Sequence, residues 1–269
     1  MTGAAKVRLG DYTWPEVQAL LEHSPVAVVP VGAFEQHGPH LPLRVDAALS
    51  EWMAETAAAE ANAGGAHVVV TPAVWTGYSP HHRDFPGTVT LDDATFGKLV
   101  AQVALSLHGA GFRRILLLNG HGGNMALLRN AVQVLRYEHG VRVSTASYWD
   151  FALRDLADWR ESEAGGIMHA CEMETALMLA HRPDLVQMDK ARDVFLERSR
   201  WAMADLLSGG TVTSAASFAE LTPTGVIGAP TLATEARGRD LAAHMAGRLA
   251  EFLADFATWT LPPEEETTP

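Results

Sequence analysis

Short apolar runs alternate along the chain with longer stretches whose apolar residues recur at helical spacing. The apolar runs predict four buried strands, at residues 25–32, 67–73, 113–120 and 141–150. The helical stretches fall at residues 47–65, 93–109, 125–140 and 233–259. Residues 165–182 are predicted to begin as a glycine turn and to become a helix that stops before Pro183. Strands that alternate with helices are typical of a parallel sheet covered by helices. We therefore expect an α/β protein, a three-layer α/β/α architecture with a mostly parallel central sheet.

The size of the chain fits one large domain. It has 269 residues, 48% of them hydrophobic, which is enough to bury a large core. No internal repeat or linker divides the sequence, so we predict a single domain over residues 1–269. The segment 260–269 contains "PPEEETTP" and is predicted to be a solvated, disordered acidic tail.

Charge and cysteine content narrow the partners and the compartment. The formal net charge is -12, which argues against nucleic acid and anionic membrane as standing partners, because both need a basic surface. Cys171 is the one cysteine, so no disulfide can form within the chain and a reducing compartment is expected. Residues 1–22 lack the apolar core of a signal peptide, and no segment reaches the ~18 to 20 apolar residues of a membrane span. We expect a cytoplasmic protein.

Three polar clusters lie in segments where a predicted strand or glycine turn ends and the next element begins. They are Glu35 with His37, His121 in the turn "NGHGGN", and His169 with Glu172. In open α/β sheets, ligands bind in the crevice beyond the carboxyl ends of the strands. We therefore expect these side chains to converge there.

The spacing of these residues suggests which of them bind metal. Glu35 and His37 are two apart, so extended backbone points both to the same side. His169 and Glu172 are three apart and would share one helical face, so Glu172 is the expected ligand. Glu174 would point away from that face and contact the ligands, not the metal. Imidazole and carboxylate without thiolate suit zinc, manganese or iron(II). A carboxylate such as Asp46 can bridge two ions, and two ions can activate water and polarise a carbonyl, which indicates a hydrolase.

Each residue also has a simpler interpretation. Asp46 could be only the N-cap of the following helix. His121 could be a turn residue, or part of an esterase-type oxyanion loop, although the chain has no G-x-S-x-G motif to supply the serine. The adjacent pair His81 and His82 is typical of loop surface. Neither a P-loop nor G-x-G-x-x-G is present, which weakens nucleotide-dependent functions.

Four ordered segments resemble the signatures of the creatininase family of amidohydrolases. They are "VPVGAFEQHGPHLPL" followed by Asp46, "FPGTVTL", "NGHGGN" and "HACEMET", all within residues 24–185. The resemblance implies a cytosolic α/β enzyme, often a homohexamer, whose two-metal centre opens a carbon–nitrogen amide bond. Zinc is the first expectation for both metals, with manganese and iron as alternatives.

The resemblance also implies roles for single residues. One ion would be bound by Glu35, Asp46 and His121, and the other by His37, Asp46 and Glu172. His169 would carry the proton from the attacking water to the leaving nitrogen. Glu172 is expected to be catalytic as well as a metal ligand. The residues expected to contact the substrate are His82, Tyr78, Gly122 and Asn124.

Departures from the family pattern shape the expected substrate. Gly122 and Gly123 stand where creatinine-hydrolysing members have an aromatic residue and a glutamate, and Gly165 and Gly166 stand where a tryptophan is usual. We therefore expect a formamide, lactam or cyclic amide rather than creatinine. The alternatives are hydrolysis of a carbon–carbon bond in a cyclic ketone, trimming of a cofactor precursor peptide, a non-catalytic metal-binding protein, and a cofactor-dependent oxidoreductase. The last lacks its dinucleotide motif.

Overall fold

The structure is a computed structural model that describes residues 6–197, 200–203, 205–208 and 210–260. The predicted acidic tail therefore lies outside the described residues, apart from Thr260.

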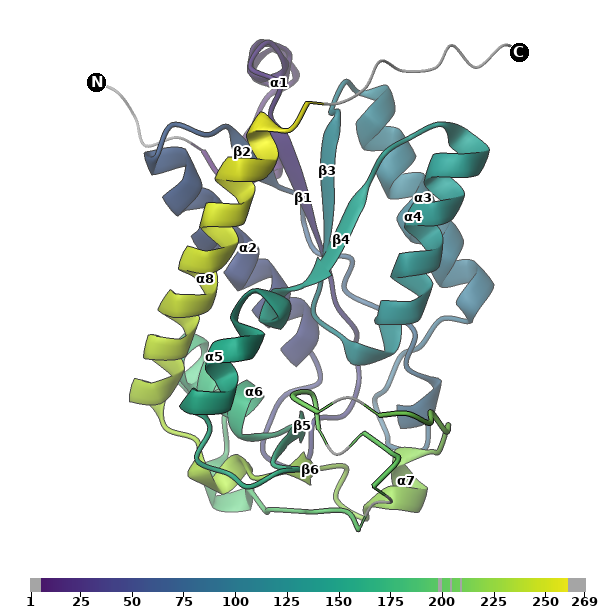
Figure 1. The fold of residues 1–269 in the computed structure, drawn as a ribbon, viewed down its shortest axis with the longest axis vertical. Helices are drawn as coiled ribbons and strands as arrows, with labels where there is room; N and C mark the ends of the chain where they lie inside the picture. The colour runs from purple at the N-terminus through teal and green to yellow at the C-terminus, as the bar shows by residue number, and fades with distance from the viewer. Residues whose placement is uncertain (1–5, 198–199, 204, 209, 261–269) are drawn as a thin grey trace.

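A four-stranded parallel sheet forms the centre of the molecule (Figure 1). Its strands are β1 (Val26–Val31), β2 (Val68–Val70), β3 (Arg114–Asn119) and β4 (Ser144–Ser147). They lie in the order β2-β1-β3-β4, and β1 pairs in parallel with both β2 and β3. The four strands predicted from the apolar runs are confirmed, each within a few residues of its predicted range.

Helices cover both faces of this sheet, which confirms the predicted fold class. α2 (Val45–Ala63), α6 (Glu172–His181) and α8 (Glu235–Thr258) pack with Val26 and Val28 of β1. α1 (Trp14–Leu21), α3 (Asp93–Gly109) and α4 (Met125–His139) contribute to a second core with Ala27 and Val29. Successive residues of a strand point to opposite faces, so β1 supplies both cores and its residues are all apolar.

The segment before α6 differs from its prediction. Residues 165–182 were expected to be a glycine turn that becomes a helix, but the structure forms the strand β5 (Ile167–His169) first, which pairs with β6 (Ile227–Gly228). Ala170 then adopts a φ of 48°, a left-handed conformation that cannot belong to a regular α-helix. α6 therefore begins only at Glu172, and His169 lies outside it.

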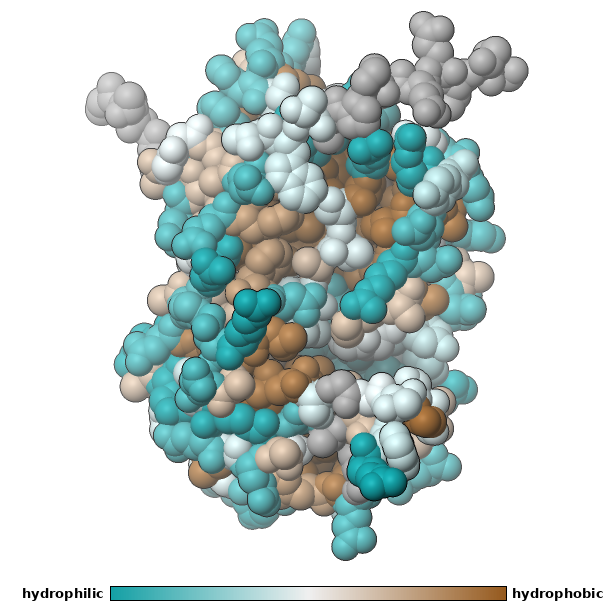
Figure 2. All heavy atoms as spheres, viewed as in Figure 1, coloured by the Kyte–Doolittle hydropathy of each residue, from teal (hydrophilic) through white to brown (hydrophobic). Residues whose placement is uncertain are grey.

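The other two α-helices of the described residues are α5 (Leu153–Trp159) and α7 (Phe218–Leu221), and short 3₁₀ turns join several of the elements. A hollow of about 420 Å³ lies between α4, the start of β4 and the end of α8, with Val132, Val143 and Phe256 among its lining residues. Figure 2 shows apolar residues gathered in the gap between α8 and α4, and hydrophilic residues along the outer sides of both helices. Among the described residues, no helix combines the length and the apolar character needed to cross a bilayer.

Candidate metal centre

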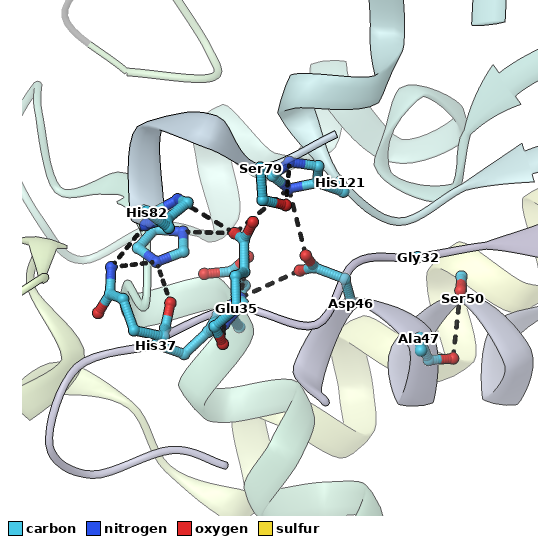
Figure 3. A network of polar contacts seen from close by, with 12 residues as sticks. Gly32, Glu35, His37, Asp46, Ala47, Ser50, Ser79, His82 and His121 are labelled. Atoms are coloured by element: carbon cyan, nitrogen blue, oxygen red, sulfur yellow. Dashed lines mark hydrogen bonds and ion pairs between the residues drawn. The ribbon is translucent and has the colours of Figure 1, made fainter. Parts of the chain in front are cut away.

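The polar clusters meet where the sheet changes winding direction. β2 lies on one side of β1 and β3 on the other, so the loops that leave β1 and β3 run in opposite directions from the carboxyl end of the sheet. Such a switch point is the usual ligand crevice of an open α/β sheet. Glu35 and His37 follow β1 and His121 follows β3, and Figure 3 shows their side chains turned toward one another. The structure thus brings together the first two clusters predicted from the sequence.

Two glycines allow the first turn of α2 to enter this crevice. A Cβ built on Gly32, directly after β1, would lie 2.4 Å from the backbone of Ala47. A Cβ on Gly120, directly after β3, would lie 2.4 Å from the carbonyl oxygen of Asp46. Because any larger residue would push the helix away, these glycines let α2 carry Asp46 to the centre of the site. The N-cap position belongs to Arg44, so the interpretation of Asp46 as a cap is not borne out.

Backbone carbonyls fix which nitrogen of two histidines carries the proton. His37 Nδ1 lies 3.2 Å from the carbonyl oxygen of Glu35, and His121 Nε2 lies 3.1 Å from that of Tyr78. A carbonyl only accepts hydrogen bonds, so each of these nitrogens is the donor. The other ring nitrogens, His37 Nε2 and His121 Nδ1, therefore face the interior as lone pairs when the rings are neutral, which is the arrangement seen in metal-binding histidines.

Asp46 directs one carboxylate oxygen to each of these imidazoles. Its Oδ1 lies 3.0 Å from His37 Nε2, and its Oδ2 lies 3.2 Å from His121 Nδ1. A lone pair of nitrogen facing an anionic oxygen at this distance needs a cation between them, either a proton or a metal ion. Burial would lower the pKa of His37, but Asp46 and Glu174 outweigh it and raise that pKa to about 9. A metal ion would displace this proton.

Three buried carboxylate oxygens support the second possibility. Both oxygens of Glu35 and Oδ2 of Asp46 are inaccessible to solvent and have no hydrogen-bond partner among the described residues. His121 Nδ1 lies 3.3 Å and His82 Nε2 3.2 Å from Glu35 Oε1, without hydrogen-bond geometry. An unsatisfied buried carboxylate is costly, and such groups are normally paired or bound to a cation. The residues present therefore fit divalent metal ions.

Glu174, and not Glu172, reaches this centre, which corrects the sequence-based assignment. Glu174 Oε1 lies 3.8 Å from His37 Nε2, and His37, Asp46 and Glu174 form a group of candidate ligand atoms within 4.8 Å of one another. Burial raises the pKa of Glu174 to about 7.

Glu172 points the other way, toward the loop before β5. Its two oxygens accept hydrogen bonds from the backbone N–H groups of Glu161 and Ser162, at 2.9 and 3.1 Å. Arg237 lies 3.5 Å from Glu172 Oε1. His169 belongs to β5 and Glu172 to α6, so the two residues do not share a helical face.

His169 and His82 close the other side of the cluster. His169 Nε2 lies 2.8 Å from the carbonyl oxygen of Gln36, so this nitrogen carries the proton and Nδ1 faces Glu35 Oε1 at 3.7 Å. Burial lowers the pKa of His169 well below its usual value, with smaller contributions from His37 and His82. Glu35, His37 and His169 form a further candidate ligand group.

The histidine pair of the long loop lies at the site and not on an open surface. His82 is buried, and His81 is half-buried and groups with Glu35 and His121 as candidate ligands. The two rings lie with their centroids 4.3 Å apart in a short 3₁₀ turn, Pro80–His82. The interpretation of both as loop surface is therefore wrong. Periodicity gives no signal here, because contacts distant in the sequence place this loop.

Three residues expected to contact the substrate have different surroundings. The Tyr78 side chain packs on the apolar core beside α3, and only its carbonyl reaches His121. Asn124 is buried. Its Oδ1 accepts a hydrogen bond from the backbone N–H of Tyr78 at 2.9 Å, and its Nδ2 donates to the carbonyl oxygen of Gly32 at 3.0 Å, so it holds the two loops together. Gly122 is exposed, with nothing within 4 Å of a Cβ built on it. Contact between these residues and a substrate stays a prediction, and the geometry does not favour it for Tyr78 and Asn124.

Comparison with known proteins identifies the family. Residues 10–253 match the family Creatininase, described as creatinine amidohydrolase. The chain is 34% identical to the mycofactocin precursor peptide peptidase of Mycolicibacterium smegmatis over 244 residues, which cover 90% of this chain and 89% of that one. It is 33% identical to the creatinine amidohydrolase of Pseudomonas putida over 204 residues, 70% and 76% of the two chains. It is 27% identical to the 3-dehydro-scyllo-inosose hydrolase of Thermotoga maritima, over 94% of this chain and 86% of that one.

Solved structures share the fold. A Bacteroides fragilis protein provisionally assigned as creatinine amidohydrolase superposes with a TM-score of 0.83 at 26% identity, covering 98% of this chain and all 100% of that one. A structure described as a manganese creatininase gives a TM-score of 0.78 at 28% identity, covering 93% and 98%. A mutant creatininase described as the Zn–Zn type gives 0.76 at 27% identity, also covering 93% and 98%. This chain is a hydrolase of the creatininase family.

Proposed function

We propose that the protein is a hydrolase with two divalent metal ions that cleaves the carbon–nitrogen bond of a small, non-peptide amide. Glu35, Asp46 and His121 would hold one ion. His37, Asp46 and Glu174 would hold the other. Asp46 belongs to both sets, because its two oxygens face different histidines at 3.0 and 3.2 Å. This division of the Asp46 carboxylate is the observation that carries the proposal.

The donor atoms favour zinc, with manganese or iron as alternatives. All of the proposed ligands are imidazole nitrogens or carboxylate oxygens, and this set suits these three metals. Related structures described with manganese and with two zinc ions support the same choice. The chemistry that such a pair of ions supplies when bound is activation of water and polarisation of a carbonyl group.

His169 is placed to move the proton that hydrolysis requires. Its Nδ1 carries a free lone pair on the side of Glu35, while Nε2 is held by the carbonyl oxygen of Gln36. The depressed pKa keeps the ring neutral near pH 7, so Nδ1 accepts the proton of water as its oxygen bonds to the carbonyl carbon. The same proton then goes to the nitrogen as the carbon–nitrogen bond breaks. His82 contacts Glu35 Oε1 at 3.2 Å and helps to orient this carboxylate.

A formamide, lactam or cyclic amide is the substrate class we favour, because the chain departs from creatinine-hydrolysing members at Gly122 and Gly123. A second candidate is trimming of a precursor peptide. The 34% identity to a mycofactocin precursor peptide peptidase over 90% of this chain supports it. Both reactions break an amide bond and use the same site, so they differ only in what the crevice admits.

Parallel assays of the metal-loaded enzyme separate these candidates. One panel contains small formamides, lactams and cyclic amides. The other contains peptides that end in the cleavage sequence of the mycofactocin precursor peptide. The proposal expects turnover in the first panel that is lost in Asp46→Ala. Turnover of peptides alone would replace the small amide by the peptide. Turnover of neither, by protein that holds both metals, would contradict the proposed amide hydrolysis.

A further inference from the structure

We infer that Gln36 is a positioning residue that holds His82 and His169 in the same tautomer, with the proton on Nε2, while turning opposite ring nitrogens of the two histidines toward Glu35. The inference rests on the proposed function for the role of His169 as the group that moves the proton. Gln36 is buried and lies between the proposed ligands Glu35 and His37 in the sequence, and its side-chain amide contacts both histidines.

The orientation of the Gln36 amide follows from two partners that allow only one arrangement. Its Oε1 lies 2.8 Å from the N–H of Gly38, which only donates. Its Nε2 lies 3.0 Å from the carbonyl oxygen of Gly225, which only accepts. Exchanging the two amide atoms would place acceptor against acceptor and donor against donor. The nitrogen therefore faces the histidines.

This nitrogen determines the form of His82. Gln36 Nε2 lies 2.8 Å from His82 Nδ1, so Nδ1 accepts a hydrogen bond and carries no proton. In neutral His82 the proton then lies on Nε2, the atom that contacts Glu35 Oε1 at 3.2 Å. His82 consequently turns an N–H group toward the carboxylate, in a contact without hydrogen-bond geometry, and its lone pair on Nδ1 faces Gln36 and not the metal centre.

The main chain of the same residue determines the form of His169. The Gln36 carbonyl oxygen lies 2.8 Å from His169 Nε2 and requires a proton there. The two hydrogens of the Gln36 amide are used by His82 and Gly225, so the 3.1 Å approach of Gln36 Nε2 to His169 Nε2 is a contact between two N–H groups. His169 therefore turns its unprotonated Nδ1 inward. One residue thus makes one histidine a donor and its neighbour an acceptor.

The test reads the protonation of each ring directly, in protein labelled with ¹⁵N in its histidine side chains and freed of metal by chelation. Long-range ¹H–¹⁵N spectra distinguish pyridine-like from pyrrole-like nitrogens. The peaks of the two rings are assigned by their loss in His82→Asn and His169→Asn. We expect a pyridine-like Nδ1 and pyrrole-like Nε2 in both rings, since the amide fixes the first and the carbonyl fixes the second.

Two variants of similar size remove the amide donor. In Gln36→Glu, a carboxylate oxygen replaces the donor, so His82 Nδ1 should become pyrrole-like. In Gln36→Met, His82 should show a mixture of forms. His169 should remain unchanged in both variants, because its partner is the main-chain carbonyl. Gln102→Leu, at an exposed position on α3, is the control and should change neither ring.

Activity gives a second readout. Metal-loaded Gln36→Met should retain both metals and lose about 10 to 100-fold in kcat, as is typical when a group that orients active-site residues is removed. If His82 keeps its form in both variants, or if His169 changes together with it, the inference is overturned. Because the spectra need neither metal nor substrate, they can fail while the proposed hydrolase activity stands, and the reverse also holds.

Discussion

Glu174 and His37 face each other across the site, with 3.8 Å between Glu174 Oε1 and His37 Nε2. Glu172, two residues earlier, instead binds two backbone N–H groups of the loop before β5. Two glutamates in the first turn of α6 thus have separate tasks, one at the proposed metal centre and one in the scaffold.

This division of tasks is tested by two matched substitutions. Glu174→Gln should reduce the amount of metal that survives dialysis, because an amide oxygen is a weaker ligand than a carboxylate. Glu172→Gln should leave metal content unchanged and lower the free energy of unfolding by about 1 to 3 kcal/mol, since one buried N–H loses a charged acceptor. Metal analysis and urea unfolding measure the two effects. The reverse pattern would return the ligand role to Glu172.

Asp46 should be indispensable for metal binding. Asp46→Ala removes the carboxylate whose two oxygens face His37 and His121, so bound metal and activity should be lost together. Asp93→Ala is a suitable control, because Asp93 is an exposed acid in the first turn of α3. Retention of both ions by dialysed Asp46→Ala protein would refute the bridging role.

His169 should affect turnover without affecting metal content. His169→Ala is expected to keep both ions and to lower kcat by about 10² to 10⁴, the range for a lost general acid or base. The measurements are metal content and steady-state kinetics on whichever amide the screen identifies. An unchanged kcat would show that another group moves the proton.

The close approach of Gly120 to Asp46 should make this position intolerant of a side chain. Gly120→Ala places a Cβ 2.4 Å from the Asp46 carbonyl oxygen, and the resulting displacement of α2 should cost about 1 to 3 kcal/mol and weaken metal binding. Gly97→Ala is the control, since nothing lies within 4 Å of a Cβ there. In the interior of α3 it should stabilise the protein by about 0.5 to 1 kcal/mol. Equal effects of both substitutions in urea unfolding would contradict this account.

The sheet and its main helices could be predicted because local pattern determines them. β1 is apolar at every position since both of its faces are buried, and α3 was predicted with the bounds that the structure shows. The location of Glu35, His37 and His121 also followed from a general rule, as residues after parallel strands collect at the switch point.

The details of the site depended on backbone geometry that composition does not reveal. The left-handed Ala170 separates His169 from α6. As a result Glu174, and not Glu172, faces the proposed metal centre. His81 and His82 lie in a loop whose position is set by distant contacts, among them the packing of the His82 ring against Phe218, with centroids 4.0 Å apart. The sequence carries no signal for Gln36, because an amide between two ligands has no recognisable spacing. Its role follows from its contacts with Gly38, His82, His169 and Gly225.

The most direct test of the two-metal centre is the metal content of the protein purified without chelator, measured by plasma mass spectrometry. About two equivalents of zinc, manganese or iron per chain are expected, because both oxygens of Glu35 and Oδ2 of Asp46 otherwise lack hydrogen-bond partners among the described residues. Metal near zero, with none taken up when these ions are added, would mean that protons alone hold the cluster together and would contradict the proposed hydrolase centre.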